Sequence, residues 1–142
     1  MLKSCKYCGR IHDEKIVCEA KEKASKRWEC RRKSKAYFFR KTNDWTLKSR
    51  DIRDRDKYCC LCCKANLIGT KRQLNTIDLS VHHITPIEED YNQRLSNENL
   101  ITVCAEHHEL CETGEITRDK QRQLVRESIE GFNAEGRGVV AV

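Results

Sequence analysis

Aromatic residues, glycine and proline are scarce in this chain of 142 residues. It has nine aromatic residues, six glycines and one proline, and 38% of its residues are hydrophobic against 35% that are charged. So few apolar side chains leave a thin core, for one modest domain or two very small ones, that needs cross-links. No apolar run approaches the roughly 20 residues of a membrane span, and the first residues lack the apolar segment of a signal peptide. The sequence therefore predicts a cytoplasmic protein that does not contact a membrane.

Cysteine and histidine, in contrast, are plentiful and clustered. The chain has ten cysteines and five histidines, and four of the histidines form two adjacent pairs, at 82–83 and 107–108. The fifth histidine lies in its own group of cysteines. In intracellular proteins such clusters bind metal more often than they form disulfides. We therefore expect metal sites.

Charge is distributed unevenly along the chain. Residues 1–58 contain 19 basic and 9 acidic residues, a net of +10, whereas residues 59–142 contain 9 and 13, a net of −4. A basic region of this kind is typical of proteins that bind a polyanion such as DNA. The alternative is a solvated basic helix that only keeps the protein soluble.

The N-terminal residues have the spacing of a zinc knuckle. Cys5 and Cys8 form a Cys-x-x-Cys turn beside Gly9, so backbone N–H groups can point at the sulfurs. His12 and Cys18 can then complete a tetrahedral site. The alternative is a loose set of thiols at a frayed terminus.

Two helices are expected after this knuckle. Residues 19–41 are dense in charge and lack proline and glycine, which predicts an exposed helix. A second helix should begin at Thr42 or Asn43 as its N-cap. One of its faces carries Trp45, Ser49 and Ile52. Its arginines available to DNA phosphates are Arg50, Arg53 and Arg55.

A run of cysteines follows and offers two overlapping Cys-x-x-Cys registers. One register pairs Cys59 with Cys62, and the other pairs Cys60 with Cys63. The spacing alone does not choose between them.

An alternating segment precedes the first histidine pair. Hydrophobic residues at 77, 79 and 81 alternate with polar ones, which predicts a half-buried strand that runs into His82 and His83 and ends before Pro86. Neighbouring side chains on a strand point to opposite faces, so these two histidines should have different roles.

A second short apolar run, residues 100–103, begins after Asn99 and leads to Cys104. Cys104 and His107 have the two-residue gap of another zinc knuckle and should begin a helix. On a helix His108 points about 100° away from its neighbour and is available to a different metal. The order strand, loop, strand, helix indicates a compact ββα unit.

Together these motifs resemble the HNH endonuclease family, whose core is the ββα-metal fold. The resemblance covers about residues 53–115 and rests on His82-His83-Ile84-x-Pro86, Asn99-Leu100 and Cys104-x-x-His107-His108. The family usually carries Arg-Asp-x-x-x-Cys-x-x-Cys ahead of the first histidine. Aligned on Arg55-Asp56, that motif favours the 60/63 register. The N-terminal knuckle and basic helix also resemble short HNH proteins of bacteriophages and their relatives in bacterial genomes.

The resemblance implies a role for each matched residue. His83 would be the general base that activates water, and Asn99 would tie the loop between the strands so that His83 keeps its orientation. His82 and His108 would hold a catalytic divalent ion, Mg²⁺, Mn²⁺ or Ni²⁺, with Glu112 as a further candidate ligand. A closed structural zinc site would be formed by Cys60, Cys63, Cys104 and His107. The remaining nearby thiols, Cys59, Cys62 and Cys111, would not be ligands.

We expect an α+β fold in which a small ββα-metal core with structural zinc follows an N-terminal zinc knuckle and basic helices. Thr117 should cap a closing helix that extends to Phe132, and glycines 131, 136 and 138 mark a flexible end. The expected segments are the knuckle at 1–18, a basic helical arm at 19–56, the HNH core at 57–116, and the C-terminal helix and tail at 117–142.

The expected activity is metal-dependent hydrolysis of DNA phosphodiester bonds, in a bacterial host cell or a phage-infected cell. One alternative is a non-catalytic zinc-dependent nucleic-acid-binding protein, for which the basic region and both knuckles suffice. Another is an accessory module of a phage DNA-packaging complex. A narrower alternative has His82 and His107 as two zinc ligands, with His83 and His108 on the surface. Oligomeric state and sequence preference stay open.

Overall fold

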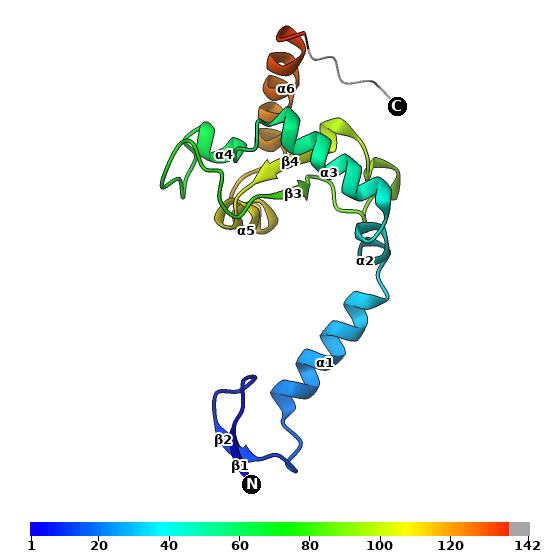
Figure 1. Cartoon of the computed structure of the whole chain (residues 1–142), viewed down its shortest axis with the longest axis vertical. Coiled ribbons are helices and arrows are strands. Elements are labelled where there is room, and N and C mark those ends of the chain that lie inside the picture. Colours follow the sequence, from blue (N-terminus) through cyan, green and yellow to red (C-terminus); the bar gives the residue numbers. More distant parts are fainter. Residues whose placement is uncertain (137–142) are drawn as a thin grey trace. The chain divides into compact units, whose positions relative to one another are not determined.

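The chain is a mixed α+β protein, as expected, with two small antiparallel sheets. The structure, a computed structural model, describes residues 1–136 (Figure 1). It divides into two compact units, Met1–Lys41 and Thr42–Val142. Among the described residues, no helix has the length and apolar content needed to cross a membrane.

The first unit contains a small hairpin and two helices. Its elements are β1 (Leu2–Ser4), β2 (Ile11–Asp13), α1 (Glu19–Arg32) and α2 (Lys35–Arg40). No residue of α1 is buried, in agreement with the exposed helix expected there. The expected single helix over 19–41 is, however, interrupted. The Ser34 hydroxyl accepts a hydrogen bond from the Tyr37 backbone N–H at 3.1 Å and so begins a separate helix.

The second unit begins with α3 (Asn43–Arg55), and Thr42 is the N-cap of the two residues expected. The Thr42 hydroxyl accepts a hydrogen bond from the Trp45 N–H at 3.2 Å. Ser49 and Ile52 are buried on the expected face. The helix packs on the β3–β4 sheet and on α6, so it belongs to the second unit rather than to an arm that ends at residue 56. The other elements are α4 (Leu61–Lys64), β3 (Ser80–His83), η1 (Tyr91–Gln93), η2 (Asn97–Asn99), β4 (Leu100–Val103), α5 (Ala105–Thr113) and α6 (Arg118–Ala134).

The two strands of this unit pair antiparallel, with His82 opposite Ile101 and His83 opposite Leu100. The predicted start of β3 at Ile77 is wrong, because that residue is 54% exposed and lies outside the strand. Its N–H instead bonds the Asn75 side chain at 3.0 Å, and Asp78 has a φ of +53°. A residue in this left-handed conformation cannot continue an extended strand.

The C-terminal helix completes the core. Thr117 caps α6, as expected, and Leu124 and Val125 are buried against the cysteine-rich cluster. Gly131, expected to mark a flexible end, lies inside the helix. Residue 138 lies outside the described residues. Because α6 supplies core side chains, the second unit does not end at residue 116.

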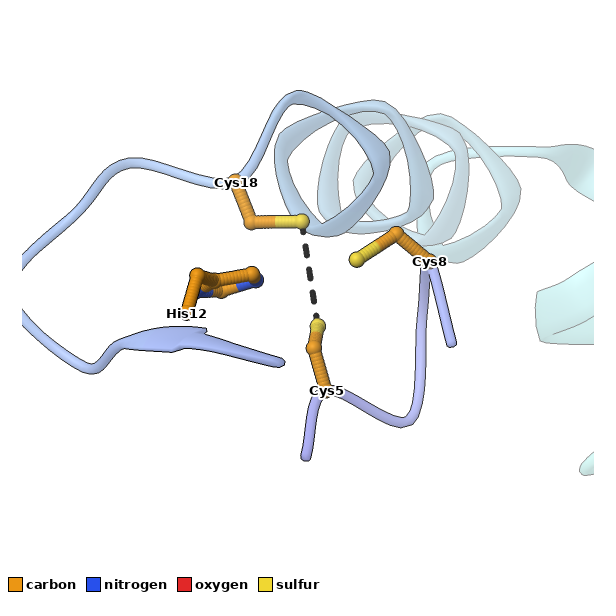
Figure 2. Close-up of side chains that lie close together, drawn as sticks. All are labelled: Cys5, Cys8, His12 and Cys18. Atoms are coloured by element: carbon orange, nitrogen blue, oxygen red, sulfur yellow. Dashed lines mark hydrogen bonds between the residues drawn. The ribbon is translucent and has the colours of Figure 1, made fainter. Parts of the chain in front are cut away.

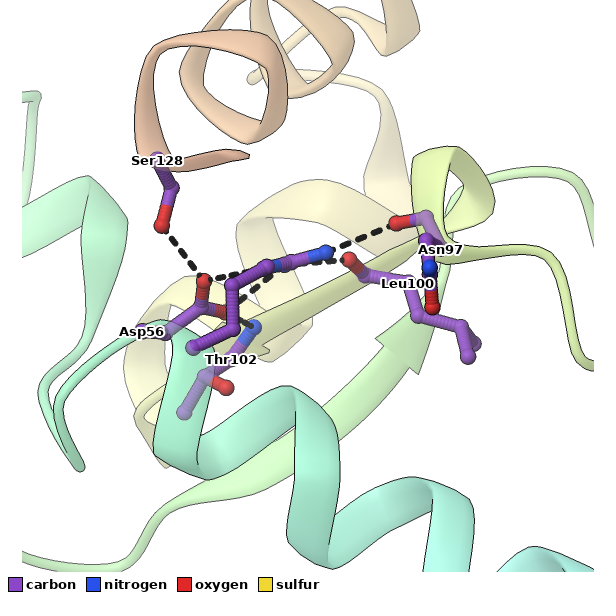
Figure 3. Close-up of polar contacts among 6 residues, drawn as sticks. Asp56, Asn97, Leu100, Thr102 and Ser128 are labelled. Atoms are coloured by element: carbon purple, nitrogen blue, oxygen red, sulfur yellow. Dashed lines mark hydrogen bonds and ion pairs between the residues drawn. The ribbon is translucent and has the colours of Figure 1, made fainter. Parts of the chain in front are cut away.

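A buried ion pair joins the principal elements of the second unit (Figure 3). Arg55 and Asp56 are each 2% exposed and form a bidentate pair at 2.7 and 2.9 Å. The arginine also donates to the Asn97 and Leu100 carbonyls, at 2.7 and 2.8 Å. The aspartate accepts from the Thr102 N–H at 3.0 Å and from the Ser128 hydroxyl on α6 at 2.8 Å.

The expectation that Arg55 contacts DNA is therefore wrong. All of its hydrogen bonds in the structure are internal, and its side chain is only 1% exposed. Arg50 is exposed and Arg53 is half-buried, so only these two of the three arginines can reach a phosphate.

Removal of this arginine should destabilise the second unit. Arg55→Ala leaves Asp56 as an uncompensated buried charge, and we expect the free energy of unfolding to fall by about 3–5 kcal/mol. Urea unfolding of the zinc-loaded protein measures this loss. The control Arg50→Ala, at an exposed position on the same helix, should stay within about 0.5 kcal/mol. Equal stability of the two variants would contradict the structural role of the pair.

Candidate metal centres and active site

Four buried side chains at the starts of two helices, α4 and α5, converge in the second unit. They are Cys60, Cys63, Cys104 and His107. The His107 Nδ1 atom lies 3.5, 3.3 and 3.2 Å from the sulfurs of residues 60, 63 and 104, and the latter two sulfurs are 3.9 Å apart. Tetrahedral zinc, at ~2.3 Å from sulfur and ~2.0 Å from nitrogen, needs S–N edges of roughly 3.5 Å and S–S edges of roughly 3.8 Å. The donor set therefore fits structural zinc.

The orientation of the His107 ring supports this assignment. Its Nε2 atom lies 2.9 Å from the Ile68 carbonyl oxygen, which can only accept a hydrogen bond. Nε2 must therefore carry the proton, and Nδ1 presents its lone pair to the sulfurs. A carbonyl that fixes the tautomer of a histidine ligand in this way is typical of protein metal sites.

Gly69 lets the loop approach this ring closely. Its φ is +86°, and an added Cβ would lie 3.1 Å from a Leu110 methyl group and 3.8 Å from His107 Nε2. Both the conformation and the space favour glycine here.

The ionisation of the thiols also indicates a cation. The Cys62 thiol and the backbone N–H groups of Cys63 and Cys104 donate hydrogen bonds to the Cys60 sulfur. They lower the pKa of this thiol to about 4, so it is ionised at neutral pH. Burial, with the charge of that thiolate, raises the pKa of Cys63 to about 12 and also raises the pKa of Cys104. Three thiolates therefore cannot share this volume unless a cation is bound, and metal binding removes the remaining protons.

The structure selects the 60/63 register. Cys62 is buried on another side of the cluster, where contacts with Cys111 and Cys60 raise its pKa and keep it a thiol. Cys59 points to the Lys57 carbonyl, at 3.4 Å. Residues 59, 62 and 111 thus lie outside the metal-ligand geometry, as expected.

The first unit holds a second cluster, formed by Cys5, Cys8, His12 and Cys18 (Figure 2). All four donor atoms lie within 4.8 Å of one another, and the sulfurs of Cys5 and Cys18 are 3.8 Å apart. Backbone N–H groups of Cys8 and Tyr7 lower the pKa of Cys5 to about 6. The four side chains lie together as the spacing predicted, so this set is also compatible with structural zinc.

His12 has the orientation of a ligand. Its Nδ1 atom lies 3.2 Å from the Asp13 carbonyl, so Nδ1 carries the proton. Its Nε2 atom is buried and lacks a hydrogen-bond partner among the described residues. The Asp13 carbonyl and the sulfurs of Cys18 and Cys5 raise the pKa of His12 to about 9, which shows that positive charge is favoured at this place. A zinc ion at Nε2 would supply that charge.

A third group has a different chemical character. His82 on β3 and His108 on α5 meet edge to face, with ring centroids 4.9 Å apart. Glu112 follows one helical turn later, and its Oε1 lies 3.7 Å from His108 Nε2. Both histidines are half-buried and the carboxylate is 61% exposed, so the group is open to solvent and contains no sulfur. Its nitrogen and oxygen donors suit an ion that keeps positions for water or substrate.

His83, the next residue on β3, is held on the other face of the strand and is 5% exposed. Its Nε2 atom lies 3.1 Å from the Arg94 carbonyl oxygen. Because that oxygen can only accept, Nε2 carries the proton and Nδ1 is the basic nitrogen. The alternative with His83 on the surface does not hold.

Asn99 ties together the loop that supplies this carbonyl. Its side-chain oxygen accepts from the Thr85 N–H at 2.7 Å, and its amide donates to the Thr85 and Gln93 carbonyls at 3.0 and 3.3 Å. Gln93 precedes the residue that bonds His83. The structure thus brings Asn99 and His83 to the same loop.

Two contributors to this site have little or no sequence signal. Trp45 on α3 stacks on His83, with centroids 4.8 Å apart and planes at 25°, whereas the helical pattern indicated only a packing residue. Arg94 contributes a backbone carbonyl, which no side-chain pattern reveals. The only sequence signal for this contact was the position of Trp45, an aromatic residue, on the buried face of its helix.

Comparison with known proteins adds no further assignment. No protein-family model matches the chain, and no curated protein or solved structure matches it either.

Metal analysis tests the two cysteine-rich sites. We expect about two zinc ions per chain, one for each cluster, and about one after Cys8→Ser or Cys63→Ser. The control Cys30→Ser alters an exposed thiol of α1 outside both clusters and should keep two. Atomic emission spectroscopy of the purified proteins gives the ratio. A single zinc ion in the unaltered protein would show that one of the two clusters does not bind zinc.

Proposed function

We propose that this protein is a metal-dependent DNA endonuclease of the HNH type. The observation that carries the proposal is a division of roles along β3: His82 joins an open group with His108, and the neighbouring His83 is buried with a defined basic nitrogen. A protein that only binds nucleic acid has no use for an imidazole held in this way. The ββα order of β3, β4 and α5 supports the same assignment.

His83 is suited to remove a proton from water. Its Nδ1 atom would accept the proton while the water oxygen bonds to phosphorus and the bond from phosphorus to the leaving oxygen breaks. The Arg94 carbonyl, which accepts from Nε2–H, stabilises the resulting imidazolium and keeps the ring from turning. Trp45 covers one ring face and Asn99 braces the loop, so both are positioning residues.

The open group would hold the catalytic ion. His82 and His108 are its proposed ligands, with Glu112 as a candidate third, and the ion is Mg²⁺, Mn²⁺ or Ni²⁺. When bound, it supplies positive charge to the phosphate and to the leaving oxygen. The cysteine-rich clusters have closed, sulfur-dominated donor sets, so they serve as structural zinc sites instead.

DNA binding would rest on charge. Arg50 and Arg53 on α3 remain available, and residues 1–41 contain 14 basic against 5 acidic residues. This distribution also favours the second candidate, a zinc-dependent nucleic-acid-binding protein without catalysis. The buried and oriented His83 favours the first candidate over the second.

Plasmid nicking tests the enzyme. With Mg²⁺, Mn²⁺ or Ni²⁺ present, His83→Ala should cut at least about 100-fold more slowly than the unaltered protein, because general-base catalysis contributes roughly 10²–10⁴-fold. Its zinc content should stay unchanged, which confirms that the fold is retained. Equal cutting by both proteins would overturn the mechanism, and no cutting by either with any of the ions would favour the non-catalytic protein.

The ion site is tested separately. His108→Ala should raise the ion concentration needed for half-maximal nicking by at least about tenfold, since ligand loss weakens metal binding more than the 10–100-fold typical of outer-shell changes. Glu109→Gln, at an exposed position on the same helix, is the control and should leave it unchanged. A similar increase in the ion concentration needed by Glu112→Gln would indicate that the Glu112 carboxylate is a third ligand. If His108→Ala needs the same ion concentration for half-maximal nicking as the unaltered protein, His108 does not bind the catalytic ion.

A further inference from the structure

The first unit contains a groove that the cleavage site does not use. It has a volume of about 390 Å³, within the range of roughly 300–1,000 Å³ common for ligand pockets. It is formed where α1 ends and α2 begins. Its lining consists of four cations, two aromatic rings and a serine hydroxyl group: Trp28, Arg31, Arg32, Ser34, Tyr37, Arg40 and Lys41.

The charge around this groove has one sign. Residues 31–41 contain six basic residues and no acidic one, and no carboxylate lines the groove. A hydrogen bond from Lys41, together with the positive charge of Lys41 and Arg32, lowers the pKa of Tyr37. Such a surface is selective for an anion.

The aromatic rings add a second requirement. Trp28 is 58% exposed on a helix with no buried residue, so it is not part of a core. The Arg32 guanidinium lies 4.5 Å from its ring centroid, and the Lys41 ammonium lies 4.4 Å from that of Tyr37. Each ring is thus paired with a cation in the same groove. A ligand that uses both features carries flat aromatic groups as well as negative charge.

We propose that this groove binds unpaired nucleotides of a nucleic-acid strand, with a base stacked on Trp28 or Tyr37 and its phosphates against the neighbouring cations. Paired bases are stacked within a duplex and cannot cover these rings, whereas a single strand or a displaced base can. The phosphates of a duplex would contact the cations, but no base would stack on either ring. The inference rests on the proposed function only in taking DNA as the polymer.

Fluorescence tests the stacking directly. The full-length, zinc-loaded His83→Ala, Trp45→Phe protein is not expected to cleave its ligand and has Trp28 as its only tryptophan. We expect a single-stranded oligothymidylate to quench this fluorescence and a duplex of equal length to quench it far less. The quench should weaken as salt is added, because phosphate contacts release counterions.

Matched variants separate stacking from charge. In the same protein, Tyr37→Ala should weaken binding of the single strand about tenfold, as expected for loss of one stacked base. Phe38→Ala is the control, because that ring is 61% exposed on the same helix but does not line the groove. Trp28→Ala, followed by anisotropy of a labelled oligonucleotide, should resemble Tyr37→Ala.

Three results would overturn the inference: no quenching by single strands, equal quenching by duplex and single strand, or equal effects of the changes at residues 37 and 38. Competition by poly-glutamate as strong as that by the oligonucleotide would also overturn it, since the groove would then bind any polyanion. Plasmid nicking by the protein with His83 intact keeps the two proposals distinct. Quenching without nicking supports this groove and rejects the nuclease, and nicking without quenching does the reverse.

Discussion

The second unit depends on one constraint: three thiols and an imidazole are buried close together, away from water. Cys60, Cys63, Cys104 and His107 are at most 5% exposed, and burial together with a neighbouring thiolate raises the pKa of residues 63 and 104. A bound cation would resolve this conflict and would join α4, the end of β4 and α5. In a chain with so few aromatic and aliphatic residues, such a cross-link would replace much of a larger hydrophobic core.

Around this centre, the backbone directs the side chains of adjacent histidines to different faces of the same strand or helix, so they have different chemical surroundings. On β3 one histidine is half-buried beside His108 and the next is buried beneath Trp45. On α5 one histidine faces the sulfurs and the next faces the open group. The Arg55–Asp56 pair holds α3, β4 and α6 together, and its bonds to the Asn97 and Leu100 carbonyls bracket Asn99. The proposed catalytic arrangement therefore rests on buried interactions that never touch a substrate.

The two units differ in how they would meet nucleic acid. Residues 1–41 carry most of the excess positive charge and, apart from their own cysteine cluster, bury little. Their groove offers rings with cations, which suits unpaired bases, while the second unit offers nitrogen and oxygen donors, which suit an ion and a phosphate. Recognition and cleavage would then belong to separate parts of one chain.

Sequence by itself determined the local features: the helix N-caps at Thr42 and Thr117, the strand at 100–103, and the four ligands of the N-terminal cysteine cluster. Caps and ligand spacings are short-range, so a few neighbouring residues specify them. The tertiary structure decided what depends on distant partners. It buried Arg55 against Asp56, began β3 at Ser80, placed Trp45 on His83 and chose Cys60 and Cys63 over the overlapping register. The late start of β3 follows from the left-handed conformation of Asp78, which the alternation of residues 77–81 does not reveal. The other outcomes depend on burial against elements distant in the chain, and no periodicity of a short segment encodes that.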